Sequence, residues 1–130
     1  DPVVGRVRCS RIWAGYEEGR LLNPMVARRQ YIGGIVFGIG MALLEQTRTD
    51  MRLGRIVNGN LADYLVPVNA DVPEIEIKFV QLEDNRSGTD GVKGIGMIGT
   101  VGTAAAIANA VFHATGRRVR SLPITLEALL

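Results

Sequence analysis

The stretch "ARRQYIGGIVFGIGMALLEQ", residues 27–46, decides how the rest of the chain is arranged. Its apolar residues recur at helical spacing and cover most of the circumference, which predicts a helix from Met25 to about Thr47 that is buried nearly all round. Glycines stand inside it at positions 33, 34, 38 and 40. Because each interior glycine costs about 1 kcal/mol relative to alanine, we expect another backbone or a large ligand to approach this helix closely.

Strand patterns lie on both sides of this helix. Residues 74–82, "EIEIKFVQL", alternate between apolar and charged side chains, which predicts a strand with one buried face. Residues 6–10 alternate in the same way and predict a half-buried strand that loses its phase near Ile12, at a bulge. The segment at 15–24 reads as a loop, because a residue that precedes proline avoids the helical region.

A second helix is predicted over residues 104–114, with Thr103 as its N-terminal cap and Gly116 as its terminator. Helices and strands together predict an α+β fold in which a small mixed sheet packs with two buried helices. A chain of 130 residues is about one domain. It begins on a turn signal without an initiator methionine, so we expect residues 1–130 to be a piece of a longer protein.

The charge and the hydropathy of the sequence argue against nucleic-acid binding and against a membrane-spanning segment. The 15 basic and 13 acidic residues give a net charge of +2, and only 5% of the residues are aromatic. Scattered arginines without a basic stripe or stacking rings argue against a nucleic-acid surface. The longest apolar run, from Tyr31 to Leu44, is shorter than the ~18 residues of a membrane span. The compartment stays open between the bacterial cytoplasm and periplasm.

Metal-binding and acid–base patterns are sparse. Cys9 is the only cysteine, so neither an internal disulfide nor a cysteine metal cage is expected, and His113 in the second helix is no metal ligand candidate. We predict no protein-derived metal ligands. Glu17 and Glu18 are adjacent acids, for which a solvated loop is favoured over a catalytic pair because neighbours in sequence need not point together.

The glycine-rich segment 91–102, "GVKGIGMIGTVG", satisfies G-x-G-x-x-G at positions 94, 96 and 99. It lacks the preceding buried strand and the later acidic residue of a dinucleotide fingerprint, and no Gly-Lys-Ser/Thr follows. Bare amide groups that lead into a helix nevertheless suit an anion or a large ligand pressed against the backbone. The alternative is a tight turn before a glycine-packed helix.

Several segments together resemble one family. They are "GRLLNP" (19–24), "ARRQYIGGIVFGIGMALLEQ" (27–46), "GRIVNGNLADYLVPVNADVPEIEI" (54–77), "GVKGIGMIG" (91–99), "AAAIANAVFHATG" (104–116) and "VRSLPIT" (119–125). In their order and spacing they are similar to the C-terminal part of the molybdopterin-binding large subunit of the xanthine dehydrogenase and aldehyde oxidase family. The bacterial aldehyde and isoquinoline oxidoreductase types are the most similar.

The resemblance implies that residues 1–130 are the C-terminal fragment of a molybdopterin-binding oxidoreductase domain and are not active alone. The implied cofactor is molybdopterin with molybdenum, in the cytosine dinucleotide form, shared with upstream residues. The implied partners are the upstream part of the large subunit and iron–sulfur subunits, with an FAD subunit as a further partner. The implied substrates are aldehydes or aromatic heterocycles.

The resemblance also implies binding residues. Gln30 matches a glutamine that hydrogen-bonds the cofactor, and its amide can donate and accept at once; the alternative is a glutamine that faces solvent. Lys93, Gly94 and Gly96 match the loop whose backbone passes the metal, although Lys93 can also be read as a solvated charge. The glycines of the 27–46 helix are then expected to form a wall beside the cofactor.

Met97 departs from the family pattern. In the loop Gly-Glu-Ile/Leu-Gly the glutamate is the catalytic base, whereas this chain reads Gly96-Met97-Ile98-Gly99, and a thioether cannot take a proton. General-base assistance contributes about 10²- to 10⁴-fold, so base function at Met97 is doubtful. The sequence therefore leaves two functions open: one wall of a molybdenum hydroxylase site, or a non-catalytic scaffold or interaction subunit derived from the family.

Overall fold

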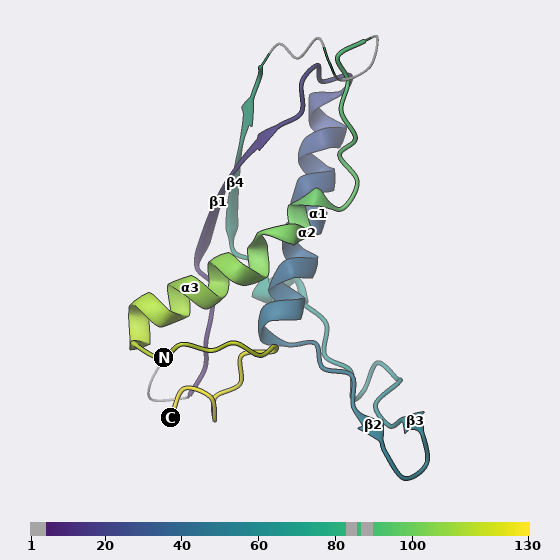
Figure 1. Cartoon of the computed structure of the whole chain (residues 1–130), viewed down its shortest axis with the longest axis vertical. Helices are drawn as coiled ribbons and strands as arrows, with labels where there is room; N and C mark the ends of the chain where they lie inside the picture. Colours follow the sequence, from purple (N-terminus) through teal and green to yellow (C-terminus); the bar gives the residue numbers. More distant parts are fainter. Residues whose placement is uncertain (1–4, 83–85, 87–89) are drawn as a thin grey trace.

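A long helix with a narrow parallel sheet along one side forms the body of this computed structural model, which describes residues 5–82, 86 and 90–130. The elements are β1 (Arg11–Glu17), α1 (Pro24–Leu43), β2 (Thr49–Asp50), β3 (Arg55–Ile56), the 3₁₀ turn η1 (Asn69–Asp71), β4 (Glu74–Val80), α2 (Ile98–Val101) and α3 (Thr103–Thr115). Figure 1 shows β1 and β4 side by side along α1, while α2 and α3 cross the middle of α1.

The sequence at the start of α1 fixes where the helix begins. The Asn23 side chain accepts a hydrogen bond from the Val26 amide at 3.1 Å, and Pro24 occupies the first turn, where its missing N–H costs nothing. The helix ends at Leu43, a turn earlier than expected. Its predicted burial on all sides is wrong, because Phe37 is 58% exposed and Met41 is 47% exposed.

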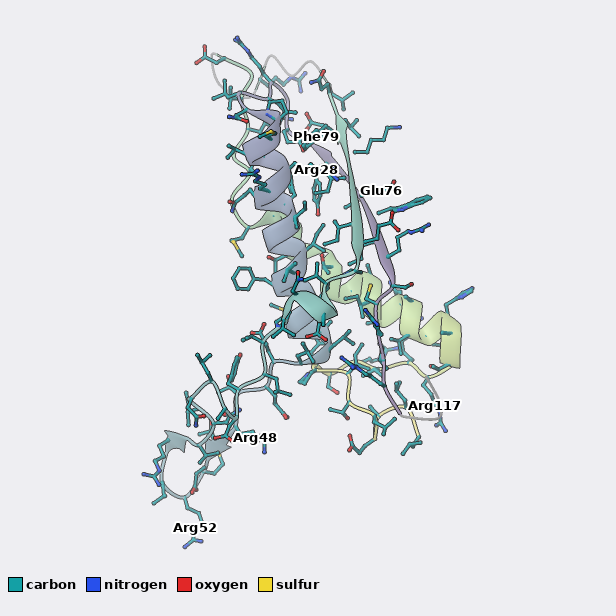
Figure 2. The ribbon with its side chains drawn as sticks, turned by 180° about the vertical axis from the view of Figure 1, so that it is seen from behind. Arg28, Arg48, Arg52, Glu76, Phe79 and Arg117 are labelled. Atoms are coloured by element: carbon teal, nitrogen blue, oxygen red, sulfur yellow. The ribbon has the colours of Figure 1, made fainter. Side chains whose placement is uncertain are left out.

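β1 and β4 form a parallel pair in which Ile12, Ala14 and Tyr16 lie opposite Ile75, Ile77 and Phe79. These side chains face α1, and the charged residues between them face away, as Glu76 does in Figure 2. The strand predicted at 74–82 is confirmed. The strand predicted at 6–10 is misplaced, because the hydrogen-bonded strand begins at Arg11. The predicted loss of phase is present: Ser10 and Arg11 are both exposed, and the inward positions change from 7 and 9 to 12, 14 and 16.

The two short strands β2 and β3 pair antiparallel and form a separate arm. The arm projects away from the body, with Arg52 at its tip (Figures 1 and 2). Buried Asn58 closes its base, since its side chain accepts from the Arg48 amide at 2.8 Å and donates to the Gln46 carbonyl at 2.6 Å. The α+β class is confirmed, and the strands form two separate two-stranded sheets, one parallel and one antiparallel.

Glycines let α1 and the α2–α3 segment touch backbone to backbone. A Cβ at Gly34 would lie 3.0 Å from the Gly99 Cα, and a Cβ at Gly38 would lie 2.5 Å from the Thr103 Cβ. The Thr100 hydroxyl donates to the Gly34 carbonyl at 3.0 Å. The close approach expected at α1 is therefore made by protein backbone at Gly34 and by the Thr103 side chain at Gly38, so the prediction that these two glycines face a cofactor is wrong.

The hydrophobic core lies where α3 crosses α1. Its buried residues are Ile35, Ile39, Ala42, Ile107, Val111 and Ile124. Gly116 ends α3 in the left-handed conformation with φ +73°, as predicted. Thr103 is not the cap: it is buried and donates to the Gly99 carbonyl at 2.9 Å, and Gly102 occupies the cap position. These contacts fix the glycine-rich segment against α1.

Candidate functional site

The glycine-rich segment enters the body of the protein beside the end of β1. The Arg20 amide donates to the Gly91 carbonyl at 2.8 Å, and the Lys93 amide donates to the Glu18 carbonyl at 3.3 Å. Gly19 adopts φ +65° where it faces Val92, and a Cβ there would lie 2.3 Å from the Gly91 carbonyl oxygen. Residues 18–20 and 91–93 are thus hydrogen-bonded to each other before the loop continues toward α1.

Gln30 connects α1 to the loop. Its side-chain amide donates to the Gly96 carbonyl at 2.9 Å, and its side chain is otherwise exposed. Among the described residues nothing donates to its amide oxygen, which is available to a ligand. Gly96 takes φ +44°, a conformation that side chains rarely adopt. The structure therefore brings together two of the residues that the sequence predicted.

Lys93 lies in the same region but is held by an acid. Its ammonium pairs with the Glu17 carboxylate at 2.5 Å, and both side chains are partly buried. The second oxygen of that carboxylate accepts the Gly19 amide at 2.8 Å. Lys93 is thus an ion-paired residue rather than a solvated charge, and its role toward a ligand stays a prediction.

A cavity of about 310 Å³ lies between the end of β1, the first turns of α1 and the loop. Its lining includes Gln30, Lys93 and Ile95, with mostly apolar side chains around them. Gly94 and Gly96 are exposed, and a Cβ at either position would meet no atom within 4 Å. The loop glycines therefore keep open space beside this cavity, unlike the glycines of α1 at positions 34 and 38.

Met97 follows Gly96 and occupies the cap position of α2, where its side chain makes no capping hydrogen bond. It is 51% exposed and does not line the cavity. Its thioether has no acid–base capacity. Met97, at the position where the family pattern has a base, is thus accessible to solvent but cannot accept a proton.

Glu18 is a buried acid that the sequence analysis assigned to a solvated loop. It is 2% exposed, and neither carboxylate oxygen has a hydrogen-bond partner with good geometry among the described residues. Burial raises the pKa of its carboxyl above the usual range, and the nearby Tyr31 hydroxyl offsets this only in part. Burial of Tyr31 and its hydrogen bond to the nearby Glu18 raise the pKa of the Tyr31 hydroxyl. The Tyr31 ring stacks on the Tyr16 ring, with the ring centroids 3.9 Å apart.

The solvated-loop interpretation of Glu17 and Glu18 is wrong, because Glu17 ends β1 and pairs with Lys93, and Glu18 is buried. The burial of Glu18 follows the pattern of the strand, since Glu18 is the next inward position after Ile12, Ala14 and Tyr16.

The buried Glu18 carboxyl predicts a pH effect on stability. An acid whose pKa is raised by folding binds its proton more tightly in the folded state, so stability falls as the pH rises from 4.5, its usual pKa, through the raised value. Glu18→Gln removes this proton. Urea unfolding between pH 4 and pH 8 should show a smaller decline for Glu18→Gln than for the wild type.

Glu76→Gln, on the exposed face of β4, is the control and should follow the wild type. Parallel pH profiles for all three proteins would contradict the effect. Glu17, Lys93, Tyr16 and Tyr31 are the other ionisable groups around Glu18, and they are unchanged in the variant.

Within the described residues, no group of three or more histidine, cysteine, aspartate or glutamate side chains is placed to hold a metal ion. In the same part of the chain, no helix combines the length and the apolar character that crossing a bilayer requires.

Known proteins resemble this chain in sequence and in fold. Residues 1–73 match the family model described as a molybdopterin cofactor-binding domain. The aldehyde oxidoreductase molybdenum-binding subunit PaoC of Escherichia coli K12 is 49% identical over 127 residues, which are 98% of this chain and 17% of that protein. A putative xanthine dehydrogenase molybdenum-binding subunit of the same organism is 38% identical over 129 residues.

The chain belongs to the molybdopterin cofactor-binding domain family.

Solved structures share the fold of this molybdopterin-binding domain. Quinoline 2-oxidoreductase from Pseudomonas putida 86 superposes with a TM-score of 0.84 at 32% identity, over 93% of this chain and 16% of that one. Aldehyde oxidoreductase from Desulfovibrio gigas gives 0.85 at 28% identity, over 98% of this chain and 14% of that one. The domain thus spans about one sixth of the length of the relatives that it matches.

The residues present fit a molybdopterin. Gln30 offers an amide oxygen without a donor, suited to an N–H group of the pterin ring system. Gly94 and Gly96 leave room for a large group against the backbone, and the cavity beside them has apolar walls. Within the described residues the molybdopterin-binding domain offers no metal ligand cluster, so the molybdenum would be carried by the pterin.

Proposed function

We propose that this chain supplies one wall of a molybdopterin cytosine dinucleotide site, shared with upstream residues, in an enzyme that oxidises aldehydes or hydroxylates aromatic heterocycles. The proposal includes its place as the C-terminal fragment of a longer molybdenum-binding subunit. Iron–sulfur and FAD subunits are the proposed electron-transfer partners. Its relatives include subunits of an aldehyde oxidoreductase and of nicotine 6-hydroxylase.

The observation that carries this proposal is the hydrogen bond from Gln30 to the Gly96 carbonyl. It orients one amide proton toward the loop and leaves the amide oxygen for a ligand. The loop beyond it has glycine at positions 94 and 96, where nothing fills the space of a side chain. The Gln30 side chain on α1 thus holds the backbone of Gly96 in place and keeps its own amide oxygen beside the loop glycines.

When bound, the molybdenum cofactor would supply the redox chemistry of the reaction. Gln30 binds and orients its ring system, while Lys93 keeps the loop against the end of β1 through Glu17. The apolar residues of the cavity would bury part of the cofactor's surface. The position that should accept a proton holds Met97, so proton removal is the step that this chain does not assist.

A second function, of a different class, is favoured by Met97 alone. A subunit without a base can retain the fold as a scaffold or as a holder of the cofactor. Molybdenum and pterin analysis of the purified complex separates the two. Stoichiometric molybdenum supports the hydroxylase site, and its absence from a folded complex supports the scaffold.

Gln30→Ala is expected to lower the pterin content of the purified complex about tenfold, because the loss of one hydrogen bond to a ligand and one to the loop costs about 1.4 kcal/mol or more. Pterin released on denaturation can be quantified by fluorescence. Gln46→Ala is the control, since Gln46 is exposed and does not line the cavity. Equal pterin content in both variants would contradict the assigned role of Gln30.

A further inference from the structure

Glu18 lies where β1, α1 and the glycine-rich loop meet. It directly follows β1, and its backbone carbonyl accepts the Lys93 amide of the loop at 3.3 Å. It is 2% exposed, and its side chain lies near the Tyr31 hydroxyl of α1. Among the described residues, neither carboxylate oxygen has a hydrogen-bond partner with good geometry. This joint therefore contains a buried acid to which the proposed function gives no role.

Tyr31 belongs to a cluster of aromatic rings. Its ring stacks on the Tyr16 ring of β1, with the centroids 3.9 Å apart, and the centroid of the Phe79 ring of β4 lies 6.2 Å from that of Tyr31. Burial raises the pKa of both tyrosines, so both hydroxyls stay neutral. A tyrosine hydroxyl donates one hydrogen bond, so Tyr31 satisfies at most one oxygen of an ionised Glu18. These surroundings favour the neutral carboxyl, because a buried carboxylate without enough donors is costly.

The neighbouring charges do not offset the burial of Glu18. The negative charge of Glu17 raises the pKa of the Glu18 carboxyl further. Lys93 is held by Glu17 in an ion pair. Arg20 lines the same cavity but is exposed to solvent. An ionised Glu18 would thus be a buried negative charge beside a second negative charge, which costs free energy until water reaches it.

The residues next to Glu18 and next to Tyr31 anchor the glycine-rich loop. Residues 17–20 hold residues 91–93 through backbone hydrogen bonds and an ion pair. Gln30, which precedes Tyr31 on α1, donates to the Gly96 carbonyl at 2.9 Å. A change in the distance between Glu18 and Tyr31 would therefore move the two anchors of the loop relative to each other.

We propose that Glu18 is a positioning residue for the glycine-rich loop: its neutral carboxyl keeps residues 91–96 against α1, and its ionisation releases them. The ionised carboxyl has lost its proton to solvent and is repelled by Glu17, so it is stabilised when water enters between residues 17–20 and 91–93. The release is a property of this chain. Its consequence, weaker retention of a molybdopterin as the pH rises, rests on the proposed function.

The direction of the pH effect follows from the burial of the acid. Burial raises the pKa of the Glu18 carboxyl above 4.5, so the loop is held below the raised pKa and is released as the pH rises through it. Glu18→Gln carries a neutral amide of nearly the same shape and should hold the loop at every pH. Glu18→Ala removes the polar group and should leave the loop loosely held at every pH.

Hydrogen exchange in the purified complex, followed by mass spectrometry, measures the release. The amides of Arg20 and Lys93 report on it, since their hydrogen bonds join the loop to the end of β1. Between about pH 5 and about pH 9, after correction for the intrinsic pH dependence of exchange, their protection in the wild type should fall about tenfold or more. In Glu18→Gln it should stay constant, and Glu76→Gln, on the exposed face of β4, should follow the wild type.

Urea separates a local release from global unfolding. A local opening exposes little surface, so exchange of the Arg20 and Lys93 amides should be insensitive to low urea concentrations, whereas exchange of the α3 amides should accelerate. If the loop amides accelerated with urea as steeply as those of α3, the pH effect would belong to overall stability. That result would overturn the positioning role.

Two further results would also overturn it. Protection that does not change with pH in the wild type would show that the carboxyl does not control the loop. The same pH dependence in Glu18→Gln as in the wild type would assign the effect to another ionisable group. The wild-type and Glu18→Gln profiles decide the inference even where Glu18→Ala does not fold.

The inference and the proposed function fail separately. Molybdenum and pterin content, measured on the same preparation, reports on the function. A pterin-loaded complex whose loop protection is independent of pH would overturn the positioning role alone. Release of the loop with rising pH in a complex that never contains pterin would overturn the function alone.

Discussion

Met97→Glu raises the turnover of aldehyde or heterocycle by the complete enzyme about 10²- to 10⁴-fold, the usual contribution of a general base, if a missing base is all that limits the reaction. The backbone around this position is already fixed, because Gln30 holds the Gly96 carbonyl at 2.9 Å and α2 begins at Ile98. Met97 is 51% exposed, so a glutamate fits there without repacking. Steady-state kinetics of purified, molybdenum-loaded enzyme measures the effect.

Ile98→Glu is the matched control for this gain. Ile98 is adjacent and 48% exposed, so the variant adds the same charge in a different direction. A gain in Met97→Glu alone assigns the deficiency to the base. Equal turnover in wild type and Met97→Glu, with full molybdenum content, would leave the scaffold function as the better description of this chain.

Gly99→Ala is expected to destabilise the fold by about 3 kcal/mol, at the upper end of the usual range for overpacking. The added Cβ would lie 2.7 Å from the Tyr31 carbonyl oxygen and 3.3 Å from the Gly34 Cα. Both contacts are with backbone, so neither can be relieved by rotating a side chain. Equilibrium unfolding in urea, with circular dichroism as the signal, measures the loss.

Gly102→Ala is the control for Gly99→Ala. It lies three residues further along in the same segment, its φ is −92°, and a Cβ there meets no atom within 4 Å. We expect Gly102→Ala to be neutral or to stabilise by about 0.5 kcal/mol through lower entropy of the unfolded chain. A loss of similar size in both variants would mean that glycine is required there for backbone freedom and not for close packing.

The elements with strong periodicity were predictable from the sequence. The alternation of "EIEIKFVQL" gave β4, and Asn23-Pro24 and Gly116 marked the beginning of α1 and the end of α3. The extent of burial of α1 was not predictable, because an apolar helix has the same sequence whether or not every face is covered within the chain. Phe37 belongs to a face that this chain leaves open.

The candidate site was predictable in its members but not in its contacts. The resemblance singled out Gln30 and Gly96, which the structure joins directly. It did not indicate that Gly34 and Gly38 contact Gly99 and Thr103, since a glycine in a helix looks the same whether it faces a ligand or another helix. The pairing of Lys93 with Glu17 joins residues distant in sequence and follows no local pattern.

The contacts between the end of β1 and residues 91–93 make the glycine-rich loop depend on a distant part of the sequence. Backbone hydrogen bonds and the Glu17–Lys93 ion pair hold the loop there, and Glu17 stands 76 positions before Lys93. A substitution at Glu17 is therefore expected to shift the loop although no residue of the loop has changed.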